Sequence, residues 1–325
     1  MPFNRRHLLQ ALALPLLPAL APAAHAQAWP TRPVKLIVGY SPGGAVDVIA
    51  RSLAQPLAAA LGQAVIVDNK PGAGTNIAMR ALIDSAPDGH TLMLVANAAA
   101  ANPSLYQPPP FDTQRDLTPV SLVGRVPVVI AAGAGAGLES VAQLIAQSKA
   151  KPGSLNFGTP GNGSTPHLAV ELFERAAGIE LTHVPYKGGS QAITDVLAGH
   201  VQLVAVNALE VQPHVKAGKL RVLTVLSPQR TPIFPDAPSI GESGYPGFEA
   251  AVWYGVVGPA GLPPAVVTRL HAELQKALAL PEVRDRLAGA GGEVLPGPVE
   301  RFTMLLASEK ARYGKLIRDA RIQPD

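Results

Sequence analysis

One order of elements occurs twice in this chain, and this duplication constrains the fold more than any other feature of the sequence. Each copy contains a short β-branched strand, a glycine-rich turn, a helix, a second strand, a second turn and helix, and a third strand. The copies run from Val34 to Asn97 and from Ser154 to Asn207. Strand–helix–strand units make parallel sheets with right-handed crossovers. The duplication therefore predicts an α/β protein with two similar lobes, each a mainly parallel sheet flanked by helices.

The expected elements follow from hydrophobic spacing and from the positions of glycine and proline. In the first copy we expect strands at 34–40, 64–68 and 90–96 and helices at 47–61 and 76–85. In the second copy we expect strands at 154–159, 181–186 and 201–206 and helices at 165–177 and 190–198. The C-terminal third differs, with one strand at 250–257 and helices at 264–280 and 299–320.

Two glycine-rich turns, at matching places in the two copies, form the candidate ligand site. Open α/β sheets bind ligands at the carboxyl ends of their parallel strands, and two such rims that face each other form a cleft. Gly43 and Gly44 allow backbone N–H groups at a helix N-terminus to approach an anion closely. Gly163, Ser164 and Thr165 are the counterpart, where N–H and hydroxyl groups can bind a carboxylate. The alternative is a pair of tight turns that bind nothing.

Polar side chains near these turns have two interpretations each. Asp47 either caps the first helix and complements its dipole, or holds a ligand hydroxyl, ammonium or bridging water. Ser164 is either a helix N-cap or a carboxylate ligand. His167 is either a structural hydrogen-bonding residue or a ligand contact. Asn97 and Asn207 end the third strands, so each either completes a turn or presents an amide across the cleft.

A hydrolase is the main alternative from another functional class. Gly39, Ser41 and Gly43 match the G-x-S-x-G nucleophile elbow between a strand and a helix. That elbow uses the backbone N–H after the serine as an oxyanion donor, and here the next residue is Pro42, which has no N–H. A secreted serine hydrolase with Ser41 as its nucleophile is therefore kept only as an alternative.

The composition argues against several further classes. The chain has no cysteine, which rules out disulfides, thiolate metal sites and a cysteine nucleophile. The histidines after residue 26 lack the spacing of a helical metal site, and the glycine turns fit neither nucleotide-binding fingerprint. We therefore expect no metal and no cofactor. A formal net charge of +4 without a basic run is a poor footprint for nucleic acid.

Residues 1–26 are typical of a secretory signal peptide. An arginine pair at 5–6 precedes an apolar stretch at 8–24, and Ala-His-Ala at 24–26 fits the cleavage pattern. A membrane anchor is the alternative, but prolines interrupt a run shorter than the ~20 residues that a span needs. Export through the Sec or the twin-arginine route would place the mature protein outside the cytoplasm, without membrane insertion.

Seven motifs are ordered and spaced through the chain after residue 26. They are Trp29-Pro30-x-x-Pro33-Val34, Gly43-Gly44-x-x-Asp47, Asp68-Asn69-Lys70-Pro71-Gly72-Ala73-Gly74, Pro87-Asp88-Gly89-x-Thr91-Leu92, Gly161-x-Gly163-Ser164-x-x-His167-Leu168, Val184-Pro185-Tyr186-Lys187-Gly188 and Trp253-Tyr254-Gly255. Each motif alone is weak, but together they are specific. In this set the chain resembles the Bug family (Bordetella uptake gene), the extracytoplasmic solute receptors of tripartite tricarboxylate transporters.

This resemblance implies a two-lobed periplasmic binding protein of the Venus-flytrap type. Such a receptor closes on a small carboxylated solute and delivers it to a membrane permease. Lobe 1 would comprise residues 27–123 plus 249–325, and lobe 2 residues 124–248. The facing loops would be 40–47 and 161–167, where backbone amides and waters hold a ligand carboxylate. With the candidates above, the expected ligand-binding set is Tyr40, Ser41, Gly43, Gly44, Asp47, Asn97, Gly161, Gly163, Ser164, Thr165, His167 and Asn207.

Two positions depart from the family pattern. His90 stands where the family usually has tyrosine, and Asn207 stands where an acidic residue is common. Both departures bear on which carboxylate is bound, not on the receptor role. A sensory receptor that presents its ligand-bound form to a membrane regulator would use the same binding chemistry and stays a further alternative. We expect a monomeric, non-catalytic receptor in the periplasm.

Overall fold

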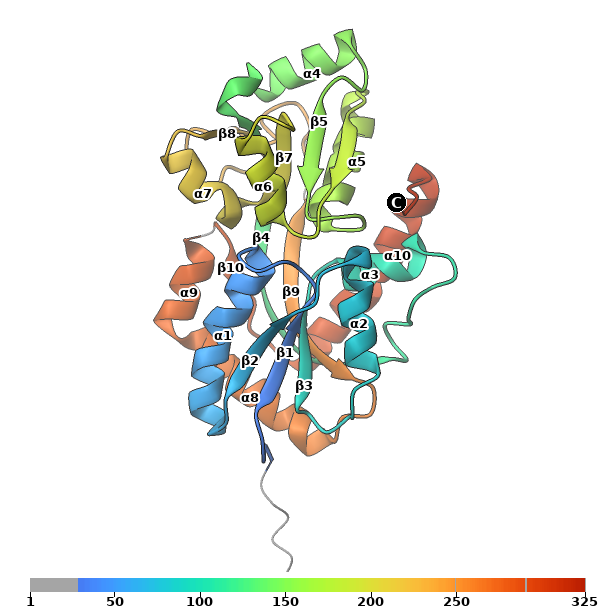
Figure 1. The fold of residues 1–325 in the computed structure, drawn as a ribbon, viewed down its shortest axis with the longest axis vertical. Coiled ribbons are helices and arrows are strands. Elements are labelled where there is room, and N and C mark those ends of the chain that lie inside the picture. The colour runs from blue at the N-terminus through green and yellow to red at the C-terminus, as the bar shows by residue number, and fades with distance from the viewer. Residues whose placement is uncertain (1–28, 249, 290, 325) are drawn as a thin grey trace, which may run out of the picture.

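The computed structural model describes residues 29–248, 250–289 and 291–324, and the predicted signal peptide at 1–26 lies outside them. Its strands form two sheets that share one strand (Figure 1). The parallel strands of the first sheet are β1 (Val34–Val38), β2 (Val65–Asn69) and β3 (Thr91–Val95). Those of the second sheet are β5 (Asn156–Thr159), β6 (Thr182–Pro185) and β7 (Leu203–Asn207).

The two parallel sets have the same strand order. It is β2-β1-β3 in the first sheet and β6-β5-β7 in the second, with the first strand of each copy in the centre. The duplication predicted from the sequence is therefore confirmed. The predicted elements of both copies are present, with bounds that differ by one or two residues.

The shared strand is β4 (Leu117–Gly133), which was not predicted. It pairs antiparallel with β9 (Ala251–Pro259) as far as Pro127 and with β7 from Val128 onward. It also pairs with β10 (Glu293–Val294) in the first sheet, on the side opposite β9, and with β8 (Leu220–Val225) in the second sheet, on the side opposite β7. The sequence obscured this strand because Pro119 and Pro127 lie within it, and proline argues against a central strand.

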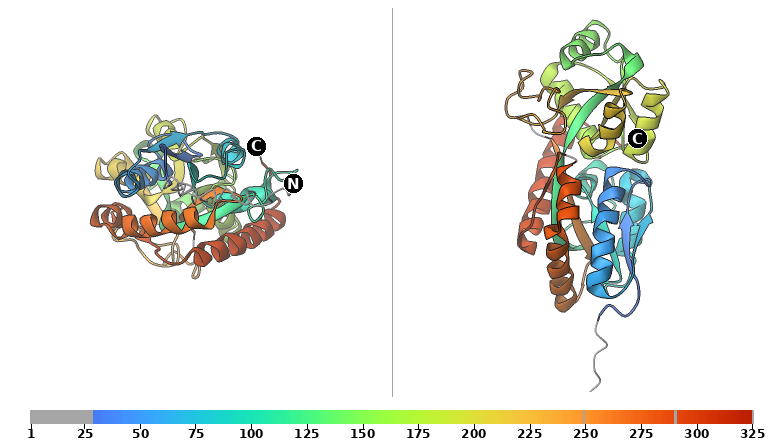
Figure 2. Two further views of the ribbon diagram at one scale, coloured as in Figure 1. Left: turned by 90° about the horizontal axis from the view of Figure 1, so that it is seen from below. Right: turned by 90° about the vertical axis from the view of Figure 1, so that its left-hand side faces the viewer.

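Helices cover both faces of the first sheet. One face carries α1 (Ala45–Leu61), α8 (Pro264–Ala279) and α9 (Pro281–Ala288), and the other carries α2 (Asn76–Ile83), α3 (Ala98–Leu105) and α10 (Val299–Ala320). Around the second sheet lie α4 (Val141–Ala150), α5 (Thr165–Ala177), α6 (Gly189–Leu197) and α7 (Ala208–Lys216) (Figure 2). No helix of the described residues is both long and apolar enough to cross a membrane.

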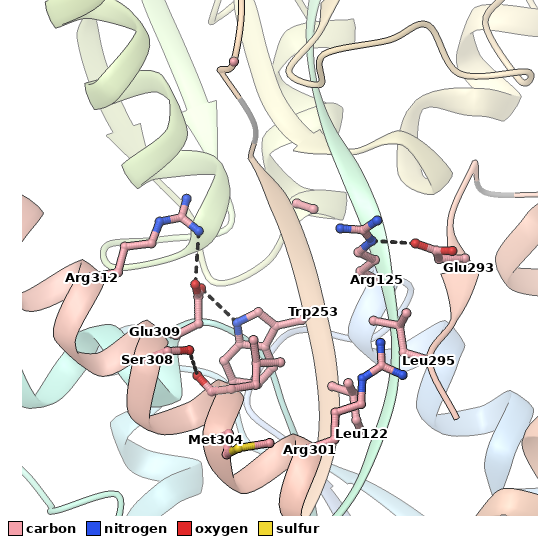
Figure 3. A pocket seen from close by; sticks show the side chains of 13 residues that line it. Leu122, Arg125, Trp253, Glu293, Leu295, Arg301, Met304, Ser308, Glu309 and Arg312 are labelled. Atoms are coloured by element: carbon pink, nitrogen blue, oxygen red, sulfur yellow. Dashed lines mark hydrogen bonds and ion pairs between the residues drawn. The ribbon is translucent and has the colours of Figure 1, made fainter. Parts of the chain in front are cut away.

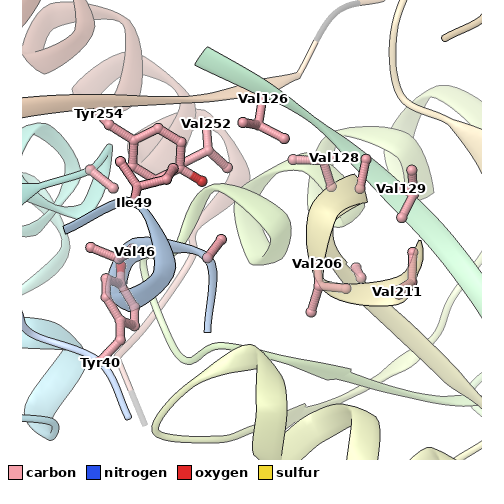
Figure 4. Packing of buried hydrophobic residues seen from close by; sticks show 14 of the residues in the cluster. Tyr40, Val46, Ile49, Val126, Val128, Val129, Val206, Val211, Val252 and Tyr254 are labelled. Atoms are coloured by element: carbon pink, nitrogen blue, oxygen red, sulfur yellow. The ribbon is translucent and has the colours of Figure 1, made fainter. Parts of the chain in front are cut away.

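One hydrophobic cluster runs through both sheets. It extends from α1 and α8 along β4 to β7 and α7, and Figure 4 shows its middle, where Val126, Val128 and Val129 follow one another on β4. A second, smaller cluster fills the opposite face of the first sheet beneath α2, α3 and α10. The alternation along β1 explains this division, since Leu36 and Val38 join the first cluster and Ile37 the second.

Cap residues set the ends of the helix α5 where the sequence predicted them. Ser164 is the N-cap, and its Oγ accepts a hydrogen bond from the His167 N–H at 3.4 Å. Pro166 lies in the first turn, where its missing N–H costs nothing. Gly178 ends the helix in the left-handed conformation, with φ 61°.

Replacing Gly255 by alanine is expected to destabilise the fold. An added Cβ atom on this β9 residue would lie 2.1 Å from Cζ of Phe302, which is fully buried in α10. We expect Gly255→Ala to lower the free energy of unfolding by about 1–3 kcal/mol in urea denaturation. Gly135→Ala is the control, because nothing lies within 4 Å of its added Cβ. Equal losses in the two variants would contradict this packing.

Candidate functional site

A narrow cavity lies between the two sheets at the carboxyl ends of their parallel strands. Its walls come from the loop after β1, the turn after β5, the starts of α1, α5 and α6, and the junction of β7 with α7. The lining residues are Tyr40, Gly44, Ala45, Val46, Ala96, Pro160, Ser164, Thr165, Pro166, Gly189, Asn207, Glu210 and Val252. Of the residues predicted as ligand-binding, the structure brings Tyr40, Gly44, Ser164, Thr165 and Asn207 to this cavity.

Asp47 shapes the loop after β1 and does not line the cavity. Its buried carboxylate accepts hydrogen bonds from the Gly43 N–H (2.9 Å), the Asn69 amide (3.0 Å) and the Arg51 guanidinium (3.0 Å). Asn69 also donates to the Tyr40 carbonyl at 3.1 Å. Burial acts to raise the pKa of Asp47, but these hydrogen bonds outweigh it and hold the pKa below its ordinary value. Asp47 therefore holds the loop that carries Tyr40 in place.

The loop after β1 touches the turn after β6 directly. The N–H and the Oγ of Ser41 both donate to the Lys187 carbonyl, at 3.0 and 3.2 Å. The Oγ of Ser190 donates to the Pro42 carbonyl at 3.2 Å. Gly188 permits this approach, because an added Cβ atom there would lie 3.1 Å from the backbone nitrogen of Ser41. These contacts close one rim of the cavity.

The turn after β5 meets the other side of the first sheet. An added Cβ atom on Gly163 would lie 2.7 Å from Oδ1 of Asn102 in α3, and one on Gly74 would lie 3.0 Å from the Asn162 carbonyl. In each copy, therefore, the turn after the first strand contacts the turn after the second strand of the other copy. The two loops that were expected to face each other, 40–47 and 161–167, both contribute residues to the walls of the one cavity.

His167 and Gly161 stabilise the turn after β5 through hydrogen bonds. The Nδ1 of His167 accepts a hydrogen bond from the Gly163 N–H at 3.3 Å, and its ring stacks on His183 with centroids 4.2 Å apart. The Gly161 N–H donates to Oγ1 of Thr159 at 3.1 Å. Burial, with a smaller effect of His167, lowers the pKa of His183 to about 3. The imidazole of His183 is therefore neutral at physiological pH.

Asn97 is fully buried and ties three elements together away from the cavity lining. Its Oδ1 accepts from the Trp253 N–H in β9 at 3.1 Å, and its Nδ2 donates to the Tyr313 hydroxyl in α10 at 2.7 Å. Nδ2 also lies 3.4 Å from Oε2 of Glu309. Its counterpart in the second copy, Asn207, lines the cavity instead.

Glu210 lines the cavity and was missed by the sequence analysis. Its Oε1 accepts a hydrogen bond from Nδ2 of Asn207 at 3.0 Å, and its Oε2 is buried. Burial raises the pKa of Glu210 to about 7, against the opposing effect of the Asn207 amide and of the Ala45 and Asn207 backbone N–H groups. The spacing Asn207-x-x-Glu210 directly after a strand is the capping-box pattern, and this signal could have identified the residue.

A wider groove lies elsewhere, between α10, β10 and the edge of β4 and β9 (Figure 3). Four of its charged side chains form two pairs, Arg125 with Glu293 at 2.7 Å and Arg312 with Glu309 at 3.0 Å, while Arg301 donates to the Pro296 carbonyl at 2.9 Å. Glu309 also accepts a hydrogen bond from Nε1 of Trp253 at 3.2 Å. None of the predicted ligand-binding residues lines this groove.

Residues 49–322 match the family described as the tripartite tricarboxylate transporter family receptor. The chain belongs to this receptor family. Protein BugT of Bordetella pertussis is 37% identical over 302 residues, which cover 92% of this chain and 93% of BugT. The solved structure of the periplasmic binding protein BugD has a TM-score of 0.87 at 31% identity, covering 91% of this chain and 100% of that one. The structure of R. palustris Rpa4515 with adipate has a TM-score of 0.87 at 34% identity, with the same coverage.

The family membership expected from the motifs is thus confirmed, as is the two-sheet architecture of a periplasmic binding protein. In this receptor the cavity lies where the two duplicated modules meet, at the start of α1, α5, α6 and α7.

Replacing Asp47 by asparagine is expected to destabilise the receptor in a pH-dependent way. Because its folded-state pKa is lowered, the ionised carboxylate contributes stability above the ordinary pKa of an aspartate and loses it as the pH falls through the folded-state pKa. We expect Asp47→Asn to cost about 1–2 kcal/mol of unfolding free energy at pH 7 and less at pH 3, measured in urea. Asp84→Asn, in an exposed pair with Arg80, is the control and should change stability by less than about 0.5 kcal/mol. A loss that is the same at both pH values would refute this role.

Proposed function

We propose that this protein is a periplasmic receptor that binds a small carboxylated solute in the cavity between its two sheets. It then delivers the solute to the membrane permease of a tripartite tricarboxylate transporter. The family assignment supports the receptor role. A related receptor of known structure, Rpa4515, is seen with adipate, a dicarboxylate.

The convergence of four helix N-termini at one cavity carries this proposal. Gly44 and Ser164 are the N-caps of α1 and α5, Gly189 begins α6, and Asn207 is the N-cap of α7. A helix N-terminus presents N–H groups that have no partner within the helix, and the equivalent of roughly half a positive charge. A carboxylate complements such an arrangement without a positively charged side chain. Neither lysine nor arginine is among the described residues that line the cavity.

The remaining walls suit the carbon chain of the solute. Val46, Ala96, Pro160 and Val252 give the cavity apolar sides between the polar helix ends. Binding sites for small molecules combine apolar walls with a few placed polar groups in this way. These walls would suit the carbon chain of a short carboxylic acid whose charged end meets the backbone N–H groups.

Capture would follow from closure of the two lobes around the solute. We propose lobe 1 as residues 27–123 plus 249–325 and lobe 2 as residues 124–248, with β4 and β9 as the connections that bend. The contacts of Ser41 with Lys187 would form on closure and break on release. We propose that the receptor works as a monomer and reaches the periplasm through the signal peptide at 1–26.

Catalysis is not part of the proposal. The Ser41 hydroxyl donates to the Lys187 carbonyl, which cannot accept a proton as a general base, and Pro42 offers no oxyanion donor. A sensory partner in place of a permease would use the same cavity. A measurement of ligand binding therefore tests the step that a permease and a sensory partner would both require.

Filling the cavity from Gly44 is expected to weaken binding without unfolding the protein. The φ of −76° at Gly44 suits any residue, and an added Cβ atom would lie 3.5 Å from Oε2 of Glu210 in ordinary contact. We expect Gly44→Ala to retain most of its affinity and Gly44→Val to lose at least about tenfold, because the branched side chain must enter the cavity. Titration calorimetry with short mono-, di- and tricarboxylates and amino acids, with neutral sugars as controls, measures the effect. Sugar binding with no carboxylate binding would refute the proposed function.

A further inference from the structure

Three buried side-chain oxygens of cavity residues have no hydrogen-bond partner: Oγ1 of Thr165, Oδ1 of Asn207 and Oε2 of Glu210. The Thr165 hydroxyl can itself donate, whereas the Asn207 and Glu210 oxygens lack a donor. Asn207 is only 4% exposed. Its Nδ2 donates to Oε1 of Glu210, which fixes the orientation of the amide and leaves Oδ1 as an acceptor. Buried acceptors without a donor are rare in native proteins, so two neighbouring ones in a ligand cavity indicate a missing donor.

The carboxylate of Glu210 lies against the opposite wall of the cavity. An added Cβ atom on Gly189 would lie 2.0 Å from Oε2 of Glu210, and one on Gly44 would lie 3.5 Å from it. Only a glycine at 189 leaves room for the carboxylate in this position. Glu210 is thus held beside the N-termini of α1 and α6, within the cavity that is proposed to bind the solute.

An ionised Glu210 repels a second carboxylate in this cavity. The titratable groups that face it are Tyr40 from the loop after β1 and Tyr254 from β9, and burial raises the pKa of both phenols, which remain neutral. Burial also raises the pKa of Glu210 to about 7. Among the described side chains that line the cavity, Glu210 therefore supplies the charge that a solute meets. An ammonium group cancels the repulsion and supplies three N–H donors, enough for both open acceptors, whereas a hydroxyl supplies one.

We propose that Asn207 and Glu210 form a subsite for an ammonium group, a proposal that rests on the proposed function. The receptor would then select amino acids over carboxylic acids that lack an amino group. Glu210 is the specificity-determining residue of this subsite. Asn207 positions it through the bond to Oε1 and contributes the second acceptor.

Matched ligands that differ in one substituent test the subsite. Succinate, L-malate and L-aspartate share a four-carbon diacid skeleton, and glutarate and L-glutamate share the five-carbon one. We expect the intact receptor to bind the amino member of the better-fitting series about 10- to 100-fold more tightly than the unsubstituted acid, as expected for a charge-assisted hydrogen bond. The hydroxy acid should fall between them. In Glu210→Gln the preference should shrink to within about threefold.

A buried carboxylate outside the cavity gives the matched control. Glu174 in α5 is mostly buried and accepts a hydrogen bond from the Leu181 N–H, but it does not line the cavity. Glu174→Gln should leave the ligand preference unchanged. Urea denaturation of both variants shows whether each is folded at the temperature of the titration.

Proton exchange on binding is a signature that a merely structural role of Glu210 would not produce. At pH 7 an ammonium group should drive Glu210 to its ionised form and release a proton, whereas an unsubstituted diacid should drive it to take one up. Titrations in two buffers with different ionisation enthalpies measure this number of protons. Glu210→Gln should abolish both exchanges.

The possible outcomes separate the two proposals. Equal or tighter binding of succinate and glutarate, or a preference for amino acids that persists in Glu210→Gln, would overturn the ammonium subsite and leave the carboxylate receptor standing. If the intact protein binds no carboxylate in either series or in the wider panel, the proposed function fails and this inference fails with it.

Discussion

The structure depends on one strand that is hydrogen-bonded on both sides in two successive sheets. At about 3.3 Å per residue, β4 extends over about 55 Å, with β9 and β10 beside its first part and β7 and β8 beside its second. Its hydrophobic side chains join both sheets in a single cluster. This strand sets the distance at which the rims of the two duplicated modules meet, and so it creates the cavity.

The duplicated modules meet with approximate reciprocity, yet they supply different chemistry. The turn of the first strand in each copy contacts the second-strand side of the other. At the end of the third strand the copies diverge. Asn97 is followed three residues later by Ala100, and its side-chain amide forms hydrogen bonds with β9 and α10. Asn207 is followed three residues later by Glu210, and both residues line the cavity. Among the described residues that line the cavity, the charged side chain thus comes from the segment that follows the second copy.

The elements of the two modules could be predicted because their signals are local. Glycine, proline and serine at the helix ends, such as Ser164, Pro166 and Gly178, fix the termini within the chain segment itself. The strand β4 could not, because Pro119 and Pro127 obscure its pattern and only its partner strands stabilise it. Five of the predicted ligand-binding residues line the cavity, while Asp47 and His167 instead hold the turns that form it.

By itself the sequence determined the duplicated α/β design and the turns that line the cavity, because both follow from short-range spacing, and its motifs indicated the receptor family. The tertiary structure decided which turns touch, that Asn97 is structural, and that Glu210 reaches the cavity. These depend on contacts between residues far apart in the chain, as with Ser41 and Lys187 or Gly189 and Glu210 on separate elements. The role of a side chain depends on the electrostatic field and the neighbouring residues that packing gives it. No local sequence pattern encodes either of them.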